Sequence, residues 1–148
     1  MKPRGRARFA LVLLAGLGVG CGKFHQAREC GTFVKLVNGW LSRSASDLAA
    51  DAGSPSDPKQ IALEARRTAA RYSELSQSLA DLHVQGDELS PRVKRYEEIA
   101  TSAAQTLREV ADALDRGELE KARQKRVEFE VVAQREAPLV KEINGVCR

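Results

Sequence analysis

Three cysteines are the most reactive side chains in this chain of 148 amino acids, and they are the first candidates for chemistry. They are Cys21, Cys30 and Cys147, and none of them belongs to a C-x-x-C or C-x-x-C-H motif. Thioredoxin-type redox centres, paired zinc knuckles and c-type haem attachment sites all need cysteines at that close spacing. The spacing excludes these three kinds of site and leaves a disulfide, a modified thiol or a buried free thiol.

Histidine and methionine, the other common ligands of metals and haem, are scarce. Neither His25 nor His83 has a Glu three residues before it, so the Glu-x-x-His pairs of a ferritin-like di-metal site are missing. The sole methionine is Met1, which we expect to be removed with the N-terminal segment, and this excludes a haem held by Met and His. We therefore expect no metal and no cofactor, and we interpret His83 as a solvent-facing or partly buried residue at a helix edge.

Motifs for nucleophilic catalysis are also missing, because the chain has no Gly-x-Ser-x-Gly and no phosphate loop. Its many carboxylates alternate with bases at helical spacing, as Lys125 does with Glu128 and Arg126 with Glu130. Such pairs are typical of a solvated helix face and contribute about 0.2–0.5 kcal/mol each. We prefer this interpretation of the basic run 121–126 to an anion-binding patch, and we expect no catalytic residue.

One acidic residue near the C-terminus departs from this pattern. Glu136, like Arg126, falls near where the apolar stripe of the last helix should continue, and Pro138 predicts a kink because it lacks a backbone donor. In one interpretation the stripe drifts around the helix and Val127 and Val131 take over. In the other, the segment forms a polar or opened site for a ligand. We favour the first.

The N-terminus has the pattern of an export signal. Four basic residues among the first eight precede an apolar run from Phe9 to Leu17, and small residues follow it before Cys21. The apolar stretch is about twelve residues long, whereas a helix that crosses a membrane needs roughly 20. We therefore predict that residues 1–20 are a signal peptide that is cleaved.

Residues 17–21, with the sequence Leu-Gly-Val-Gly-Cys, resemble the processing site of bacterial lipoprotein precursors. In that family the cysteine thiol is acylated, and a signal peptidase then cuts before the cysteine. Leu17 lies one position earlier than the family's usual aliphatic residue, so ordinary cleavage near the same site is the alternative. The resemblance implies a lipid on Cys21 and, because Gly22 follows instead of Asp, sorting to the outer membrane of a Gram-negative cell.

The number of cysteines favours the same conclusion without reference to the processing site. A secreted protein with three cysteines has one left over, and acylation of Cys21 would account for it. Cys30 and Cys147 would then remain as a disulfide pair in an oxidising compartment. Two free buried thiols are the alternative.

The net charge gives no sign of a nucleic-acid partner. Lys and Arg number 24 against 20 Asp and Glu, but four of the bases lie in the predicted signal peptide, where there are no acids. The sequence pI of about 9.1 is therefore a property of that segment. The mature chain has no basic excess, and we expect it to bind no nucleic acid.

Apolar residues recur every three or four positions from about residue 26 onward, which predicts an all-α domain. After a tether over 21–29, we expect four helices, at about 26–51, 58–85, 91–115 and 118–146. The stripe of the first helix comprises Cys30, Val34, Val37, Leu41 and Leu48, widened by Phe33 and Trp40. The stripes of the second and third helices have unbroken heptad spacing, which suits side-by-side packing.

Helix ends are marked by capping and turn residues. Asp57 before Pro58 predicts the N-cap of the second helix, and Ser90 before Pro91 predicts that of the third. Gly117 is the expected left-handed residue of the turn that follows. These short connections predict an up-down-up-down four-helix bundle over residues 30–148.

This topology brings both ends of the bundle domain together, with Cys30 opening the first helix and Cys147 closing the fourth. A disulfide between them closes a very long loop and would be worth about 5 kcal/mol in the chain-entropy model. We expect this end and the loop at 86–90 to lie near the membrane. The turns at 52–57 and 115–118 would project away, where a protein partner could contact them.

Together these features predict an exported protein, anchored by lipid to the outer membrane or periplasmic, that acts as an interaction or scaffold module and not as an enzyme. The alternative is a small-ligand-binding or sensor bundle with a pocket between helices. That pocket would lie beside Trp40, Tyr72, Tyr96 or the kink at Pro138.

Overall fold

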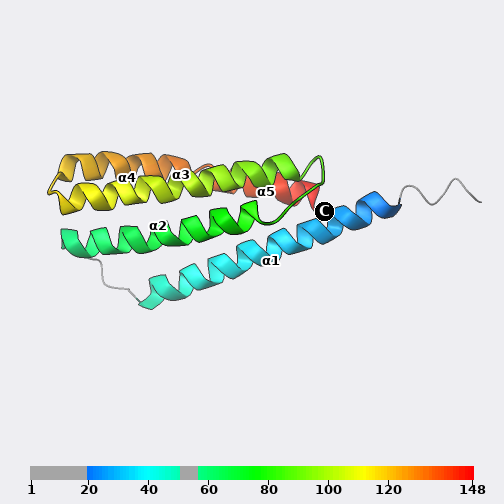
Figure 1. Cartoon of the computed structure of the whole chain (residues 1–148), viewed down its shortest axis with the longest axis horizontal. Helices are drawn as coiled ribbons and strands as arrows, with labels where there is room; N and C mark the ends of the chain where they lie inside the picture. The colour runs from blue at the N-terminus through cyan, green and yellow to red at the C-terminus, as the bar shows by residue number, and fades with distance from the viewer. Residues whose placement is uncertain (1–19, 51–56) are drawn as a thin grey trace, which may run out of the picture.

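The computed structural model describes the backbone of residues 20–50 and 57–148, and the side chains of 25–43 and 57–148. The described chain forms only helices, so the predicted all-α class is confirmed. The helices are α1 (Gly20–Ala50), α2 (Pro58–Ala80), α3 (Ser90–Asp115), α4 (Leu119–Ala133) and α5 (Glu136–Val146) (Figure 1). Most of the predicted signal peptide and most of the predicted turn at 52–57 lie outside the described residues.

The helices run alternately along one long axis, which confirms the up-down-up-down bundle (Figure 1). The most extensive packing is between α2 and α3, followed by α3 with α4. α4 and α5 follow each other along α3 and together form the fourth rod. The loop between α2 and α3 lies at the same end as the C-terminus, and the turn between α3 and α4 lies at the opposite end.

The centre of the bundle is rich in alanine. Buried alanines occur on both α2 and α3, namely Ala62, Ala65, Ala69, Ala100, Ala103, Ala104, Ala111 and Ala113. Small side chains at the contact allow two helices to approach closely, so the tightest packing lies where these residues face each other. Larger buried residues follow the predicted heptad spacing along α3 and in the second half of α2, where Leu75 and Leu79 lie. In the first half of α2, Ala62 and Ala69 are buried, whereas Ile61 and Thr68 of the predicted stripe are only half-buried.

The predicted stripe of α1 is partly wrong. Cys30 and Val37 are buried as expected, but Val34 and Leu41 remain 40% and 49% exposed. The residues predicted to widen the stripe, Phe33 and Trp40, are 3% and 8% exposed and lie at its centre. α1 therefore turns its aromatic side toward the bundle, because burying a large aromatic ring removes more apolar area from water than burying a valine. The side chain of Leu48 lies outside those described.

The predicted helix starts are confirmed at one position and wrong at two others. Asp57 caps α2, and its Oδ1 accepts a hydrogen bond of 3.0 Å from the Lys59 amide. Ser90 is the first helical residue of α3 and not its N-cap; Leu89 precedes it with no side-chain cap bond. α1 begins at Gly20, so the segment predicted as a tether forms helical turns that continue into the bundle.

The ends of α2 and α3 differ from each other in how well they were predicted. α2 stops at Ala80 instead of continuing to about 85, so His83 lies in the connection to α3 and not on a helix edge. His83 is exposed and has a positive φ of 44°, a conformation that ends a helix. Gly117 has a φ of 72° after α3, which confirms the expected left-handed turn residue.

The fourth predicted helix is interrupted near its middle. α4 ends at Ala133 and α5 begins at Glu136, with Gln134 and Arg135 forming a turn between them. Pro138 lies in the first turn of α5, where its missing N–H would have had no partner within that helix. The predicted kink is therefore a complete break.

The drifting stripe that we favoured for this segment is wrong. Val127 and Val131 are 58% and 48% exposed, on the side of α4 that faces solvent. Leu139 and Ile143 of α5 are almost completely buried instead. After the break, the apolar side of α5 faces the core through Leu139 and Ile143, and the two valines of α4 do not belong to the buried stripe.

Candidate functional site

The disulfide predicted from the cysteine count is confirmed. Cys30 and Cys147 are joined, with their Cα atoms 5.6 Å apart. The bond links the N-terminal half of α1 to the residue that follows α5. Because α1 packs less closely against α2 than α3 does, this covalent link is a major attachment of α1 to the bundle.

Hydrogen bonds reinforce the same end of the molecule. Glu29 of α1 accepts hydrogen bonds from the amides of Gln85 and Gly86, at 2.8 and 3.1 Å. Its side chain is only 10% exposed, and His25 Nδ1 lies 3.3 Å from Glu29 Oε1. The sequence analysis did not single out Glu29, because the loop whose amides it binds is far away in the chain and no local pattern links them.

Five aromatic side chains from four helices gather further along the core. The Tyr72 ring of α2 lies 5.1 Å from the Trp40 ring of α1 and 6.0 Å from the Phe129 ring of α4, measured between centroids. Tyr96 of α3 makes an edge contact at 6.0 Å with Phe33 of α1. Such tilted and edge-on pairs contribute about 0.5–1.5 kcal/mol beyond the burial of their area.

Trp40 has a second contact that holds its position. The indole Nε1–H donates a hydrogen bond of 3.1 Å to the backbone oxygen of Arg71 on α2. This backbone oxygen belongs to α2 and also accepts a hydrogen bond from a side chain of α1. The ring of Trp40 is fixed against Tyr72 by this bond and by packing, as is common for buried indoles.

Glu136 is the unusual member of this neighbourhood. It is the first residue of α5, and its Oε1 is buried with no hydrogen-bond partner in the described part of the protein. Burial raises the pKa of Glu136 above its ordinary value of 4.5, and the contact with the Tyr72 hydroxyl offsets part of that rise. No basic side chain contributes to the shift, so a negative charge here is not compensated by a described residue.

Glu136 contributes to the raised pKa of both Tyr72 and Tyr96. Burial, followed by the charge of Glu136, raises the pKa of Tyr96 to about 12. Burial also raises the pKa of Tyr72, and the charge of Glu136 and its hydrogen bond to the phenol raise it further. Both phenols therefore stay neutral at physiological pH. We call Trp40, Tyr72, Tyr96, Phe129 and Glu136 the aromatic–carboxylate cluster.

The cluster contains Trp40, Tyr72 and Tyr96, three of the residues beside which a pocket was expected, and Glu136 lies two positions before Pro138. Glu136 follows the helix break, and Trp40 also borders a shallow groove of about 280 Å³ between α1 and α2. The rim of that groove includes Leu36 of α1 and Ser78 of α2. A half-buried carboxyl group whose pKa is raised, beside aromatic rings, is a candidate functional site, and the sequence had marked both Glu136 and the rings.

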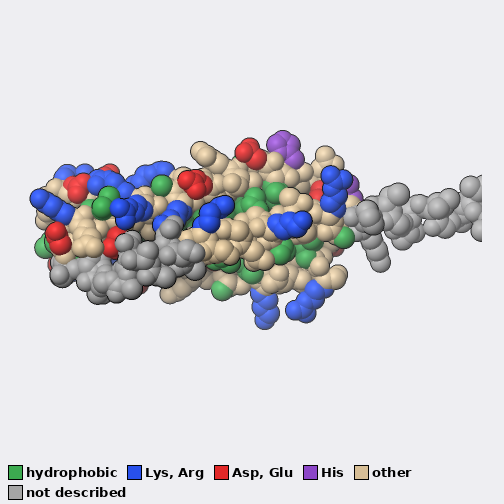
Figure 2. Space-filling view, turned by 90° about the horizontal axis from the view of Figure 1, so that it is seen from below, with side chains coloured by type: hydrophobic (Ala, Val, Ile, Leu, Met, Phe, Trp, Pro, Cys, Tyr) green, Lys and Arg blue, Asp and Glu red, His purple; other side chains and the backbone are tan. Residues whose placement is uncertain are grey.

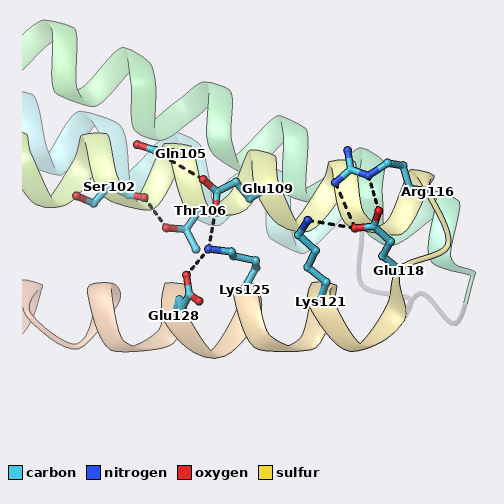
Figure 3. Close-up of polar contacts among 9 residues, drawn as sticks. All are labelled: Ser102, Gln105, Thr106, Glu109, Arg116, Glu118, Lys121, Lys125 and Glu128. Carbon is cyan, nitrogen blue, oxygen red and sulfur yellow. Dashed lines mark hydrogen bonds and ion pairs between the residues drawn. The ribbon is translucent and has the colours of Figure 1, made fainter.

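The basic run of α4 has the paired character expected of a solvated face. Lys125 Nζ lies 2.9 Å from Glu109 and 2.7 Å from Glu128 (Figure 3). Arg126 is exposed and lies 3.4 Å from Glu130, so it does not enter the apolar stripe. Hydrogen bonds and charge from Lys125 lower the pKa of Glu109. These contacts confirm the predicted pairs.

The turn after α3 is also bordered by charged pairs. Arg116 Nε donates to Glu118 at 2.9 Å, and Lys121 Nζ lies 3.3 Å from the same carboxylate (Figure 3). Arg66 of α2 reaches Asp112 and Asp115 near the end of α3, at 3.1 and 2.5 Å. Basic and acidic side chains are interspersed on the face shown in Figure 2.

Three further results concern the predicted chemistry. Within residues 25–43 and 57–148, no group of three or more His, Cys, Asp or Glu side chains is arranged to hold a metal ion. None of the described helices combines the length and apolar character needed to cross a membrane. The side chain of Cys21 lies outside those described, although its backbone belongs to α1.

Comparisons with protein-family models, with curated proteins and with solved structures find no match to this chain.

Proposed function

We propose that this chain is an exported cell-envelope protein, anchored by a lipid on Cys21, whose helical bundle acts as a non-enzymatic interaction module. The observation that carries the proposal is the disulfide between Cys30 and Cys147. Disulfides persist in oxidising compartments outside the cytosol, which supports export. The bond also leaves Cys21 as the one cysteine without a disulfide partner, at the position where the lipoprotein resemblance requires it.

The helical start of the mature chain defines how the anchor would hold the bundle. Cys21 and Cys30 both belong to α1, and at 1.5 Å per residue the backbone between them rises about 14 Å. That distance is about half of what an extended tether would span. The disulfide end would therefore lie close to the bilayer surface.

The opposite end is the proposed contact surface for a protein partner. α3 has 26 residues, so the turn after it lies about 40 Å from the disulfide end along the rod. That turn carries Arg116 and Glu118 at its surface, with Arg66 nearby on α2. A lipid at one end and an exposed charged turn at the other are the expected parts of a scaffold that holds its partner away from the membrane.

Mass spectrometry of the full-length protein made in a Gram-negative host tests the anchor. We expect a diacyl or triacyl modification on the N-terminal Cys21, together with a mass increase of about 2 daltons on reduction of the disulfide. Cys21→Ser should abolish the lipid and leave the disulfide intact. A chain that begins near residue 21 with an unmodified thiol would overturn the anchoring proposal.

A second function, small-ligand binding between the helices, is favoured by one observation. Glu136 Oε1 is buried in an aromatic environment and lacks a partner among the described residues. The Tyr72 phenol hydrogen-bonds to this carboxyl group, and its remaining oxygen would normally be bonded as well, because an unsatisfied polar atom is costly to bury. A ligand that completes its bonding would remove that cost.

A further inference from the structure

The aromatic–carboxylate cluster could bind a ligand, and neither the proposed lipid anchor nor the proposed partner surface involves its residues. It combines one acidic group with rings from four different helices, and two of its members, Phe129 and Glu136, lie on either side of the break between α4 and α5. Glu136 and Phe129 are only half-buried, so the cluster meets solvent on the side of α4 and α5. Trp40 and Tyr72 are buried and form its inner wall.

The chemistry of these groups defines the molecule that would complement them. The unpartnered Oε1 needs a donor or a positive charge, and no described basic side chain provides one. The faces of aromatic rings attract cations, and they also offer apolar contact to alkyl groups. Metal ions are poor candidates, because the described part of the chain offers a single carboxylate here and no second hard ligand.

We propose that the aromatic–carboxylate cluster binds a small organic cation of the alkylammonium class. Its nitrogen would pair with the Glu136 carboxylate, and its alkyl groups would contact Tyr72 and Phe129 with Trp40 behind them. This inference names the ligand class for the second function proposed above. It does not depend on the lipid anchor, which involves the other end of α1.

Proton binding competes with such a ligand. The titratable groups that face Glu136 are Tyr72 of α2 and Tyr96 of α3, and both are neutral near physiological pH. The cation pairs with the ionised carboxylate, whereas burial favours the protonated form. Its affinity therefore increases as the pH rises through the pKa of Glu136 and becomes constant above it.

The chain carries its own reporter for this site. Trp40 is the sole tryptophan, and its ring lies 5.1 Å from that of Tyr72. The full-length protein with its disulfide intact would be titrated with tetramethylammonium chloride while Trp40 fluorescence is recorded. Sodium chloride at the same ionic strength controls for salt, and tert-butyl alcohol is an uncharged molecule of similar shape.

The proposal predicts a saturable fluorescence change with tetramethylammonium that neither control produces. Glu136→Gln keeps the shape of the side chain, avoids burying a charge and should weaken binding about tenfold or more. Glu130→Gln removes an exposed acid of the same helix region and should leave binding unchanged. Phe129→Leu should weaken binding by a smaller factor, because it removes one ring and keeps the carboxylate.

Three results would overturn the proposal. These are a flat titration with tetramethylammonium, an equal response to tert-butyl alcohol, and a response that Glu136→Gln leaves unchanged. Phosphatidylcholine vesicles distinguish the two sources of such a cation. A Glu136-dependent response to vesicles supports a lipid headgroup, and a response to the soluble ion alone supports a free small molecule. Neither titration reports on Cys21, so failure here and failure of the anchor are separate findings.

Discussion

A single carboxyl group, that of Glu136, is the residue at which the chemistry of this protein departs from ordinary helix packing. Other acids of the last two helices lie beside bases at the surface, as Glu128 and Glu130 do. Glu136 instead faces two phenols, and burial raises its pKa. A group whose pKa is higher in the folded state than in the unfolded chain binds a proton more tightly when folded.

The first prediction concerns the pH dependence of stability. Stability from the protonated carboxyl is fully present below the unfolded pKa of about 4.5 and is lost as the pH rises through the higher folded pKa. Glu136→Gln should therefore increase the free energy of unfolding near pH 8 by about 1 kcal/mol, a modest figure because solvent screens this half-buried group. The gain should vanish near pH 4.

Urea unfolding of both proteins at the two pH values measures this difference. Glu130→Gln is the matched control, since it removes a charge from an exposed pair and should change stability little at either pH. An advantage of the glutamine variant that is equal at both pH values would contradict the assignment, because it would not arise from ionisation.

At the level of helices, α4 is the element held most by charge and least by burial. Ala122 is its only fully buried residue, and two of its valines face solvent. Its attachment to α3 includes the bridge of Lys125 to Glu109, a pair that lowers the pKa of Glu109. The amphipathic pattern is weak here because charged residues occupy positions on both sides of the helix.

The second prediction is that Lys125→Met destabilises the protein only slightly, because both of its ion pairs are partly exposed. The effect should shrink in about 1 M salt, which screens charges at the surface. It should also shrink as the pH falls through the lowered pKa of Glu109, since the pair is lost when that acid takes up a proton.

Chemical unfolding at low and high salt checks this prediction. Arg123→Met is a suitable control, because Arg123 pairs only with exposed Glu120 within one helix and makes no bridge to α3 among the described contacts. A loss for Lys125→Met that persists at high salt would show that its aliphatic stem, and not its charge, attaches α4 to α3.

On the scale of the whole molecule, α1 is a long helix attached mainly at one end. The disulfide and the bonds of Glu29 to the loop before α3 hold its N-terminal half. Phe33, Val37 and Trp40 then supply the apolar contacts that lead toward the aromatic–carboxylate cluster. The packing among α2, α3 and α4 is more extensive and does not depend on the covalent link.

The third prediction follows from this unequal attachment. Replacing Cys30 and Cys147 with Ala should lower the free energy of unfolding by about 4 kcal/mol, because the unfolded chain regains the entropy of a very long loop. Amide hydrogen exchange should accelerate more in α1 than in α2 and α3, since regions with few stabilising contacts open first.

Cys21→Ala is the control for this pair of substitutions, because Cys30 and Cys147 are bonded to each other and its replacement should leave the free energy of unfolding unchanged. Uniform acceleration of exchange through all helices would contradict the view that α1 is the separately opening element. It would show instead that the bundle loses its structure as one cooperative unit.

Several errors of the sequence analysis have one physical origin. An apolar period predicts that a helix has a buried side, but the direction of that side depends on neighbouring helices. Phe33 and Trp40 take the centre of the α1 contact because rings on α2 and α3 are placed to receive them, and Val34 and Leu41 remain exposed. Nothing local to α1 encodes those partners.

The features that rest on local chemistry and chain topology could be inferred from the amino-acid sequence alone. Apolar period defined the class, Asp57 and Gly117 marked helix and turn positions, and an even number of helices with three cysteines implied the pairing of Cys30 with Cys147. Each of these features depends on short-range conformational preference or on the number of helices and cysteines. None of them requires knowledge of which distant residues lie nearby in space.

The packing of the helices sets the surroundings of each side chain. It placed Glu136 among rings from other helices, gave Glu29 its partners in a distant loop, and left Val127 and Val131 in solvent. The physical reason is that burial, pKa and hydrogen bonding depend on residues far apart in the chain, which meet only when the helices pack. The helix break before Glu136 depends on both. Pro138 in the sequence predicts that the helix is interrupted, and the packing of α5 against the core determines which of its residues are buried.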